Sequence, residues 1–100
     1  MSTMYITEYS RLAGDADGRV IQAGKHDAYD TDQQVTFTAT AGASAAFGAD
    51  THLIRVSCDA AAFLAFGADP TAVTTEGTPV QANTPEFFGV VPGQKVSAVA

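Results

Sequence analysis

His52, Ser57 and Cys58 are the residues of this chain whose types and spacing could support nucleophilic catalysis. A thiol or hydroxyl is activated when an imidazole within hydrogen-bonding reach takes its proton. In an extended strand, alternate side chains share a face, and the row that runs from His52 to Cys58 is mostly apolar. The favoured interpretation is a packed or surface histidine and a small core cysteine. We therefore expect no catalytic residues and no enzyme activity.

An acidic loop at residues 14–18 is the second candidate for chemistry, because alternate carboxylates beside glycine can wrap a calcium ion. An EF-hand loop placed on Asp17 and Gly18 would need a carboxylate at Ala13 and a glutamate at Gly24. Neither is present. An Asp-Gly turn without a metal is the favoured interpretation.

The cysteine and the other histidine do not suggest a metal centre. Cys58 is the only cysteine, so an intrachain disulfide is excluded, and no second thiol or paired histidine accompanies it as a zinc site requires. His26 stands next to Asp27 in a charged segment and is expected to be solvated. No glycine-rich phosphate loop precedes a helical pattern. We expect neither a cofactor nor a metal.

Charge and composition narrow the range of partners. The 100 residues include 5 Lys plus Arg and 11 Asp plus Glu, a formal net charge of -6, with no basic cluster that could bind a phosphate backbone. Nucleic-acid binding is therefore not expected. Only 16% of the residues are charged, so small and weakly polar side chains must cover much of the surface. Such a surface suits contact with another protein, and a domain this small gains burial by forming an oligomer.

The N-terminal residues carry no targeting signal that we can identify. Residues 1–9 lack the basic start and the unbroken apolar stretch of a signal peptide. No run of about 18 apolar residues is present for a membrane span. We expect no association with a membrane, and a cytoplasmic location unless an assembly carries the chain elsewhere.

The pentapeptide Ala-Phe-Gly-Ala-Asp occurs twice, at residues 46–50 and 65–69, and each copy ends an apolar run with a turn signal. Short runs bounded by Gly, Pro or Asn recur at spacings typical of an all-β domain. The segment 60–66 is alanine-rich and could form a helix, but its phenylalanines and the following Gly67 favour a strand. The predicted strands are 19–23, 35–39, 53–58, 60–66, 79–83, 86–91 and 95–99.

The distribution of charge divides the chain at residue 32. Residues 1–32 carry most of the charges and little periodicity, which predicts an extended N-terminal arm. The strand at 19–23 could instead lie on a neighbouring subunit. Residues 33–100 carry the short strands and form the core. The predicted fold class is all-β, an antiparallel β-sandwich or jelly roll with an extended N-terminal arm.

A frame of turn motifs runs through the core, at residues 44–47, 53–56, 65–72 and 84–96. It consists of an apolar-Arg-Val run, Phe-Gly-x-x-Pro-Thr-Ala, Glu-Phe/Tyr-Phe and Pro-Gly-x-Lys-Val. This frame resembles a set of small tailed-phage proteins that are encoded among virion structural genes, and the resemblance covers about residues 44–99. It implies a capsid decoration or cement protein, made in the host cytoplasm, that clamps neighbouring major capsid subunits on the outer surface of the phage head.

The resemblance and the composition together imply an interface with the major capsid protein and with further copies of this chain, as a dimer or trimer. Tyrosine offers apolar area with a polar tip at low entropy cost, so tyrosines of the arm are the favoured anchors, unless they fold back onto their own domain. Charged side chains could pair with the shell. The predicted interface residues are Tyr5, Tyr9, Tyr29, Arg55 and Lys95, with Asp30 and Asp32 as further carboxylates.

Two other functions remain open from the sequence. A tail or head-tail joining subunit of a phage would share the β-rich composition but would assemble as a ring. A small carbohydrate- or ligand-binding β module would be expected to expose tryptophan or clustered aromatic residues on one sheet face. This chain has no Trp, which disfavours the second alternative.

Overall fold

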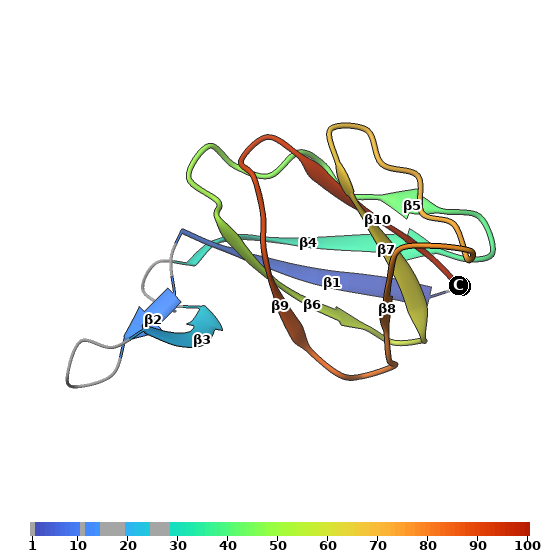
Figure 1. The fold of residues 1–100 in the computed structure, drawn as a ribbon, viewed down its shortest axis with the longest axis horizontal. Helices are drawn as coiled ribbons and strands as arrows, with labels where there is room; N and C mark the ends of the chain where they lie inside the picture. The colour runs from blue at the N-terminus through green and yellow to red at the C-terminus, as the bar shows by residue number, and fades with distance from the viewer. Residues whose placement is uncertain (1, 11, 15–19, 25–28) are drawn as a thin grey trace.

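The structure is a computed structural model that describes residues 2–10, 12–14, 20–24 and 29–100, with side chains described for 2–10 and 32–100. Within this part of the chain the regular elements are all β-strands (Figure 1). They are β1 (Ser2–Tyr9), β2 (Leu12–Gly14), β3 (Val20–Gly24), β4 (Tyr29–Phe37), β5 (Gly42–Ala43), β6 (Leu53–Cys58), β7 (Ala62–Gly67), β8 (Thr78–Val80), β9 (Glu86–Gly89) and β10 (Lys95–Val99).

The strands form two four-stranded antiparallel sheets that pack face to face. Sheet 1 has the order β4-β1-β6-β9, and sheet 2 has the order β5-β10-β7-β8. β2 and β3 pair as a separate ladder at one end of the sandwich, where β3 lies close to β6 and β9 (Figure 1). The all-β sandwich predicted from the sequence is confirmed.

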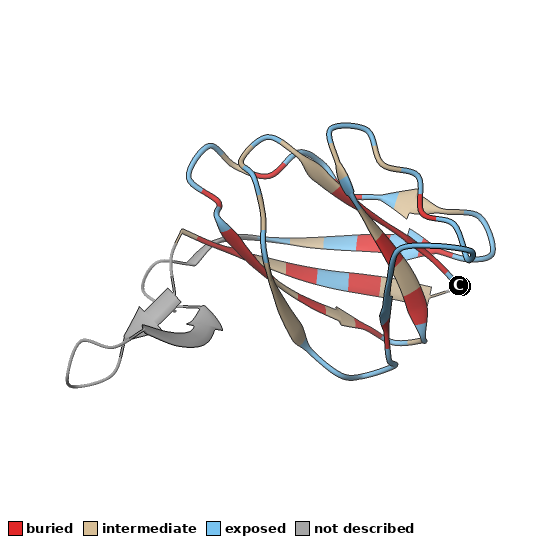
Figure 2. Cartoon of the chain, viewed as in Figure 1, coloured by how far each residue is buried: buried red, intermediate tan, exposed pale blue. Residues whose placement is uncertain are grey.

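The core lies between the two sheets and is built by alternation along each strand. In β1, Met4 and Ile6 point inward and are almost completely buried, and the register places them opposite Cys58 and Val56 of β6. Leu64 of β7 and the inward residues of β10 supply the other side of the core. Buried bands accordingly alternate with more exposed ones along β1 and β4 (Figure 2).

Most of the predicted strands are present. β6 and β10 have the predicted bounds, and segment 60–66 contributes a strand, β7, instead of a helix. Segment 35–39 contains the end of β4, whose Val35 and Phe37 are buried. The predicted strands 79–83 and 86–91 contribute the shorter β8 and β9, and 19–23 overlaps β3.

The predicted N-terminal arm is wrong for residues 2–9 and 29–32. Residues 2–9 form β1, which lies inside sheet 1 and pairs with both β4 and β6, and residues 29–32 begin β4. The boundary at residue 32 therefore divides a strand of the sandwich. The arm prediction for residues 1, 11, 15–19 and 25–28 lies outside the described residues.

The two copies of the pentapeptide have different roles. The second copy ends β7 at Gly67, as predicted. The first copy lies in the connection between β5 and β6, where Phe47 is 3% exposed and packs into the core. The Phe47 N–H donates to the carbonyl of Gln94 at 2.8 Å, so this loop extends the edge of sheet 2. The predicted turn is present in the first copy, but it follows a loop and not a strand.

Candidate functional site

The outer face of sheet 1 is the surface on which two of the predicted interface residues meet. Alternation turns Tyr5 of β1 and Arg55 of β6 away from the core, and Tyr5 is 46% exposed. The register places Tyr5 beside Gln34 of β4. It places Thr7, two residues further along the same face, between Asp32 and Arg55. This face thus carries an aromatic ring, a cation and an anion on a rigid sheet.

A hollow of about 150 Å³ opens between β1 and β4 on this face. Its lining combines an aromatic ring, a carboxylate and two amides, from Tyr5, Ile6, Thr7, Asp32, Gln33 and Gln34. These groups can both donate and accept hydrogen bonds. Small-molecule sites usually have volumes of about 300–1,000 Å³. The smaller hollow therefore suits a single side chain of a protein partner better than a separate ligand.

The other predicted interface residues do not join Tyr5 and Arg55. Tyr9 is only 4% exposed, and its ring packs against Phe87 with the ring centroids 6.2 Å apart. Tyr9 thus fits the alternative in which an N-terminal tyrosine folds back onto its own domain. Tyr29 lies opposite Tyr9 in the register, but its side chain and that of Asp30 are outside the described part of the chain. Lys95 begins β10 and belongs to sheet 2.

The connection between β7 and β8 covers part of the outer face of sheet 2. Ser97 and Val99 of β10 alternate outward, yet they are only 1% and 4% exposed. The connection between β7 and β8, residues 68–77, lies over Ser97, because Ala72 is buried and its N–H donates to the Ser97 Oγ at 3.0 Å. The two outer faces therefore differ, since a connection of the chain lies over β10 in sheet 2, whereas sheet 1 is open around Tyr5.

Glu8 is a buried acidic residue that the sequence analysis did not single out. Its carboxylate lies between the sheets, with the residue 1% exposed. Oε1 accepts hydrogen bonds from the Gly48 N–H at 2.9 Å and the Thr51 hydroxyl at 2.8 Å. Oε2 accepts one from Gln33 Nε2 at 3.0 Å, and Gln33 Oε1 accepts one from the Ala45 N–H at 2.9 Å. The network ties β1 and β4 to the connection between β5 and β6.

His52 and Cys58 do not form a nucleophile-base pair. They lie at opposite ends of β6, so extended chain holds them about 20 Å apart. His52 is exposed, whereas Cys58 is 1% exposed. Burial, and secondarily the negative charge of Asp59, raises the pKa of the Cys58 thiol from 9.0 to about 11. The thiol is therefore protonated and inaccessible at neutral pH.

Because the Cys58 thiol ionises more easily in the unfolded state than in the folded state, we expect its titration to lower the free energy of unfolding by about 2 kcal/mol between pH 9 and pH 11. The folded thiol keeps its proton up to about pH 11, whereas the unfolded thiol loses it near its ordinary pKa of 9.0, so rising pH favours the unfolded state. Urea unfolding across this range measures the effect. Cys58→Ala is the comparison, because tyrosines and lysines titrate in both proteins. The same pH dependence in both proteins would contradict the assignment.

The other candidates for chemistry from the sequence add no site. The loop at 14–18 and His26 fall largely outside the described residues. Among the residues that are described, no group of three or more His, Cys, Asp or Glu is placed to hold a metal ion.

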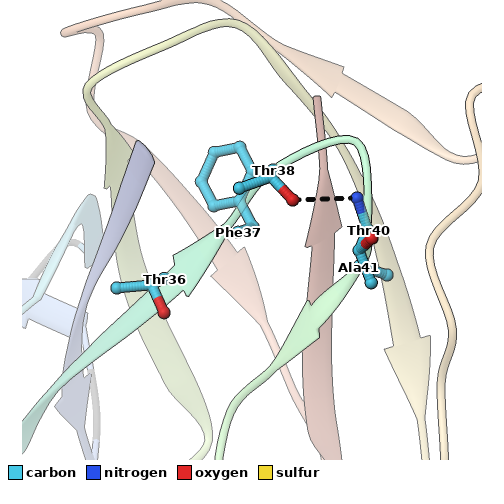
Figure 3. Close-up of a pocket in the computed structure, with 5 residues that line it drawn as sticks. All are labelled: Thr36, Phe37, Thr38, Thr40 and Ala41. Carbon is cyan, nitrogen blue, oxygen red and sulfur yellow. Dashed lines mark hydrogen bonds between the residues drawn. The ribbon is translucent and has the colours of Figure 1, made fainter. Parts of the chain in front are cut away.

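A second hollow, of about 230 Å³, lies at the turn from β4 to β5 (Figure 3). Thr38 Oγ1 accepts a hydrogen bond from the Thr40 N–H at 3.0 Å there. Hydroxyl and apolar groups line this hollow, from Thr36, Phe37, Thr38, Thr40 and Ala41. This lining contains no group that could act as an acid or base near neutral pH.

Comparisons with known proteins gave no relative. No protein-family model matches the chain, and searches of curated proteins and of solved structures found no significant match. No helix in the described part of the chain is long and apolar enough to cross a membrane. The chain is thus described by its class, a small β-sandwich with one partly covered and one open face.

Proposed function

We propose that this chain is a structural virion protein, a capsid decoration or cement protein that binds neighbouring major capsid subunits and stabilises the phage head. The observation that carries the proposal is the difference between the two outer faces. Residues 68–77 lie over part of sheet 2, whereas sheet 1 exposes Tyr5 beside a polar hollow. A rigid sheet with one open face can hold a partner without an active site. The resemblance to phage virion proteins supplies the class of partner.

The chemistry of the open face supports a protein partner. Tyrosine and arginine are enriched at protein interfaces and often contribute most of the binding energy. Tyr5 and Arg55 both lie on this face, and Asp32 adds a carboxylate in the same row as Arg55. A partner with complementary charges can therefore be oriented on the sheet as well as held by it.

The area of the face limits the affinity of a single copy. Four strands about 4.8 Å apart and four to nine residues long make a face of roughly 430 Å². A standard interface buries about 800 Å² on each partner. Firm attachment therefore requires contacts from more than one copy or from more than one capsid subunit, which is the arrangement expected at a junction between subunits.

Cryo-electron microscopy of particles from cells that express this chain with its neighbouring genes tests the proposal. We expect its density on the outer shell, at junctions between capsomers, with sheet 1 towards the shell. A ring of density at the portal or tail would replace the proposal with a head-tail joining or tail subunit. Absence from the particles would overturn both assignments.

We expect Arg55→Glu and Tyr5→Ala to weaken binding to isolated shells at least tenfold, because both side chains lie on the open face. The measurement is co-sedimentation of the purified chain with shells that lack it. Lys95→Glu is the matched control, since it makes the same change of charge on a residue of sheet 2. Equal losses from Arg55→Glu and Lys95→Glu would exclude sheet 1 as the contact face.

A further inference from the structure

The hydrogen bonds of β1 identify the free side of the edge strand β4. The carbonyl groups of Thr3 and Tyr9 accept hydrogen bonds from the N–H groups of Asp59 and His52, on the side of β6. Successive residues of a strand direct their backbone groups to opposite sides. Odd-numbered residues of β1 therefore bond with β6, and even-numbered residues bond with β4.

The same reasoning gives the direction of the backbone groups in β4. Ile6 of β1 is paired with Gln33 of β4, so Gln33 directs its N–H and C=O towards β1. Asp32 and Gln34 consequently direct theirs to the opposite side, where sheet 1 ends. Both side chains are exposed on the outer face of the sheet.

Among the described residues, β5 covers this edge of sheet 1 at the end near Thr36. Gly42 of β5 lies so close to β4 that a Cβ there would overlap the carbonyl oxygen of Thr36. Further along the edge, no backbone group among the described residues pairs with Asp32 or Gln34 on that side. Unpaired edge strands are the usual sites at which a sheet adds a further strand.

We propose that this edge of β4 pairs, antiparallel, with β4 of a second copy about a two-fold axis at Gln33. When two identical strands pair antiparallel, the two-fold axis passes either at a residue or between two residues. Only an axis at a residue puts the inward residues of both copies on the same face of the combined sheet. An axis at Asp32 would place the two Asp32 carboxylates opposite each other. An axis at Gln34 would bring Asp32 opposite Thr36, whose edge is covered.

The remaining register is self-complementary. It places Asp32 of each copy opposite Gln34 of the other, and both residues direct their backbone groups to the shared edge, so each such pair exchanges two backbone hydrogen bonds. The Asp32 carboxylate also lies opposite the Gln34 amide, which can donate a hydrogen bond to it. The carboxylates thus favour one register and disfavour the nearest alternative.

The self-complementary register is the reason for proposing a second copy as the occupant, and the pairing also enlarges the open face. Pairing about this axis makes one continuous sheet, in which both outer faces point the same way, so the combined face is roughly 850 Å² and matches the contribution of one partner to a standard interface. The inference does not rest on the proposed function. It uses the backbone edge of β4, whereas shell binding uses the outer face, so either can fail while the other holds.

Sedimentation equilibrium of the purified full-length chain, from about 1 μM to about 1 mM, tests the pairing. We expect a species of twice the 10.3 kDa chain mass.

Gln34→Asp places a carboxylate opposite Asp32 twice in each dimer and is expected to raise the dissociation constant about tenfold. Asp32→Lys combined with Gln34→Asp places opposite charges there and restores dimerisation. Gln81→Asp, the same change at an exposed position beyond β8, is the matched control and leaves the dissociation constant unchanged.

The double variant makes the test specific for the register. In the double variant, an axis at residue 32 would place the two introduced lysines opposite each other, and an axis at residue 34 would place the two introduced aspartates opposite each other. Both arrangements repel, so only the axis at Gln33 predicts that dimerisation is restored. A monomer at every concentration overturns the proposal. So does a dimer that Gln34→Asp and Gln81→Asp weaken equally, or one that the double variant fails to restore while circular dichroism shows a folded protein.

Discussion

Replacing Glu8 with alanine is expected to lower the free energy of unfolding by about 2–4 kcal/mol. The carboxylate is buried and accepts hydrogen bonds from Gly48, Thr51 and Gln33. Alanine would remove the acceptor of these three hydrogen bonds, of which the one from Thr51 is fully buried, and would open a cavity between the sheets. Urea unfolding at neutral pH measures the loss.

Two further variants show whether the loss comes from the hydrogen bonds. Glu8→Gln keeps the shape but replaces one acceptor oxygen with a donor, so we expect an intermediate loss of about 1–3 kcal/mol. Glu76→Ala, on an exposed residue, is the matched control and should change stability by less than about 0.5 kcal/mol.

The loss at Glu8 should also have a local signature. The Gly48 N–H donates to Glu8 Oε1, and the neighbouring Phe47 packs into the core, so Glu8→Gln should speed hydrogen exchange at Gly48 more than at β10. A change in stability below about 1 kcal/mol for Glu8→Ala would show that the fold does not depend on this network.

Gly42→Ala is expected to lower the free energy of unfolding by about 2–3 kcal/mol. A Cβ at this position would overlap the carbonyl oxygen of Thr36 and would also press on a methyl group of Val35 at 3.3 Å. The contacted oxygen belongs to the backbone, so relief requires β5 to move away from β4. That movement would open the margin of the sandwich at which the two sheets meet.

Gly89→Ala is the matched control for this steric argument. A Cβ at Gly89 would find nothing nearer than the carbonyl oxygen of His52, at 4.0 Å. We expect its stability to lie within about 0.5 kcal/mol of that of the unchanged protein. If thermal unfolding showed equal losses for the two alanine variants, the close approach of β5 and β4 would not be the cause.

The strands that the sequence predicted well have patterns of their own, independent of distant pairing. In β6, Ile54, Val56 and Cys58 alternate with less apolar residues and face the core. β10 follows a Pro-Gly turn, which marks its start. β5 could not be predicted in this way, because two residues carry no periodicity.

The sequence did not predict β1 because Glu8, which the structure shows to be buried, occupies one of its inward positions. The inward positions of β1 are occupied by Met4, Ile6 and Glu8, and the charged third residue interrupts an apolar alternation. Glu8 is tolerated there because loop residues about 40 positions away supply its donors. A period of two that ends in a glutamate is a signal that could have identified both the strand and the buried acid.

The sequence predicted individual residues of the candidate face, but it did not predict that they lie together on one surface. Tyr5 and Arg55 were both named from the sequence, yet their proximity depends on the pairing of β1 with β6 across about 50 residues. No local pattern specifies that pairing. For the same reason, the sequence could not show that Lys95 belongs to the opposite sheet or that Tyr9 is covered.

The partly covered face of sheet 2 also affects how copies of this protein can accumulate on a surface. A stack grows only when each molecule offers one face to the molecule below and a second, complementary face to the molecule above. Residues 68–77 occupy part of the position of that second face. Copies bound through sheet 1 would turn this connection outward, so a further layer would have to bind residues 68–77 and not a bare sheet.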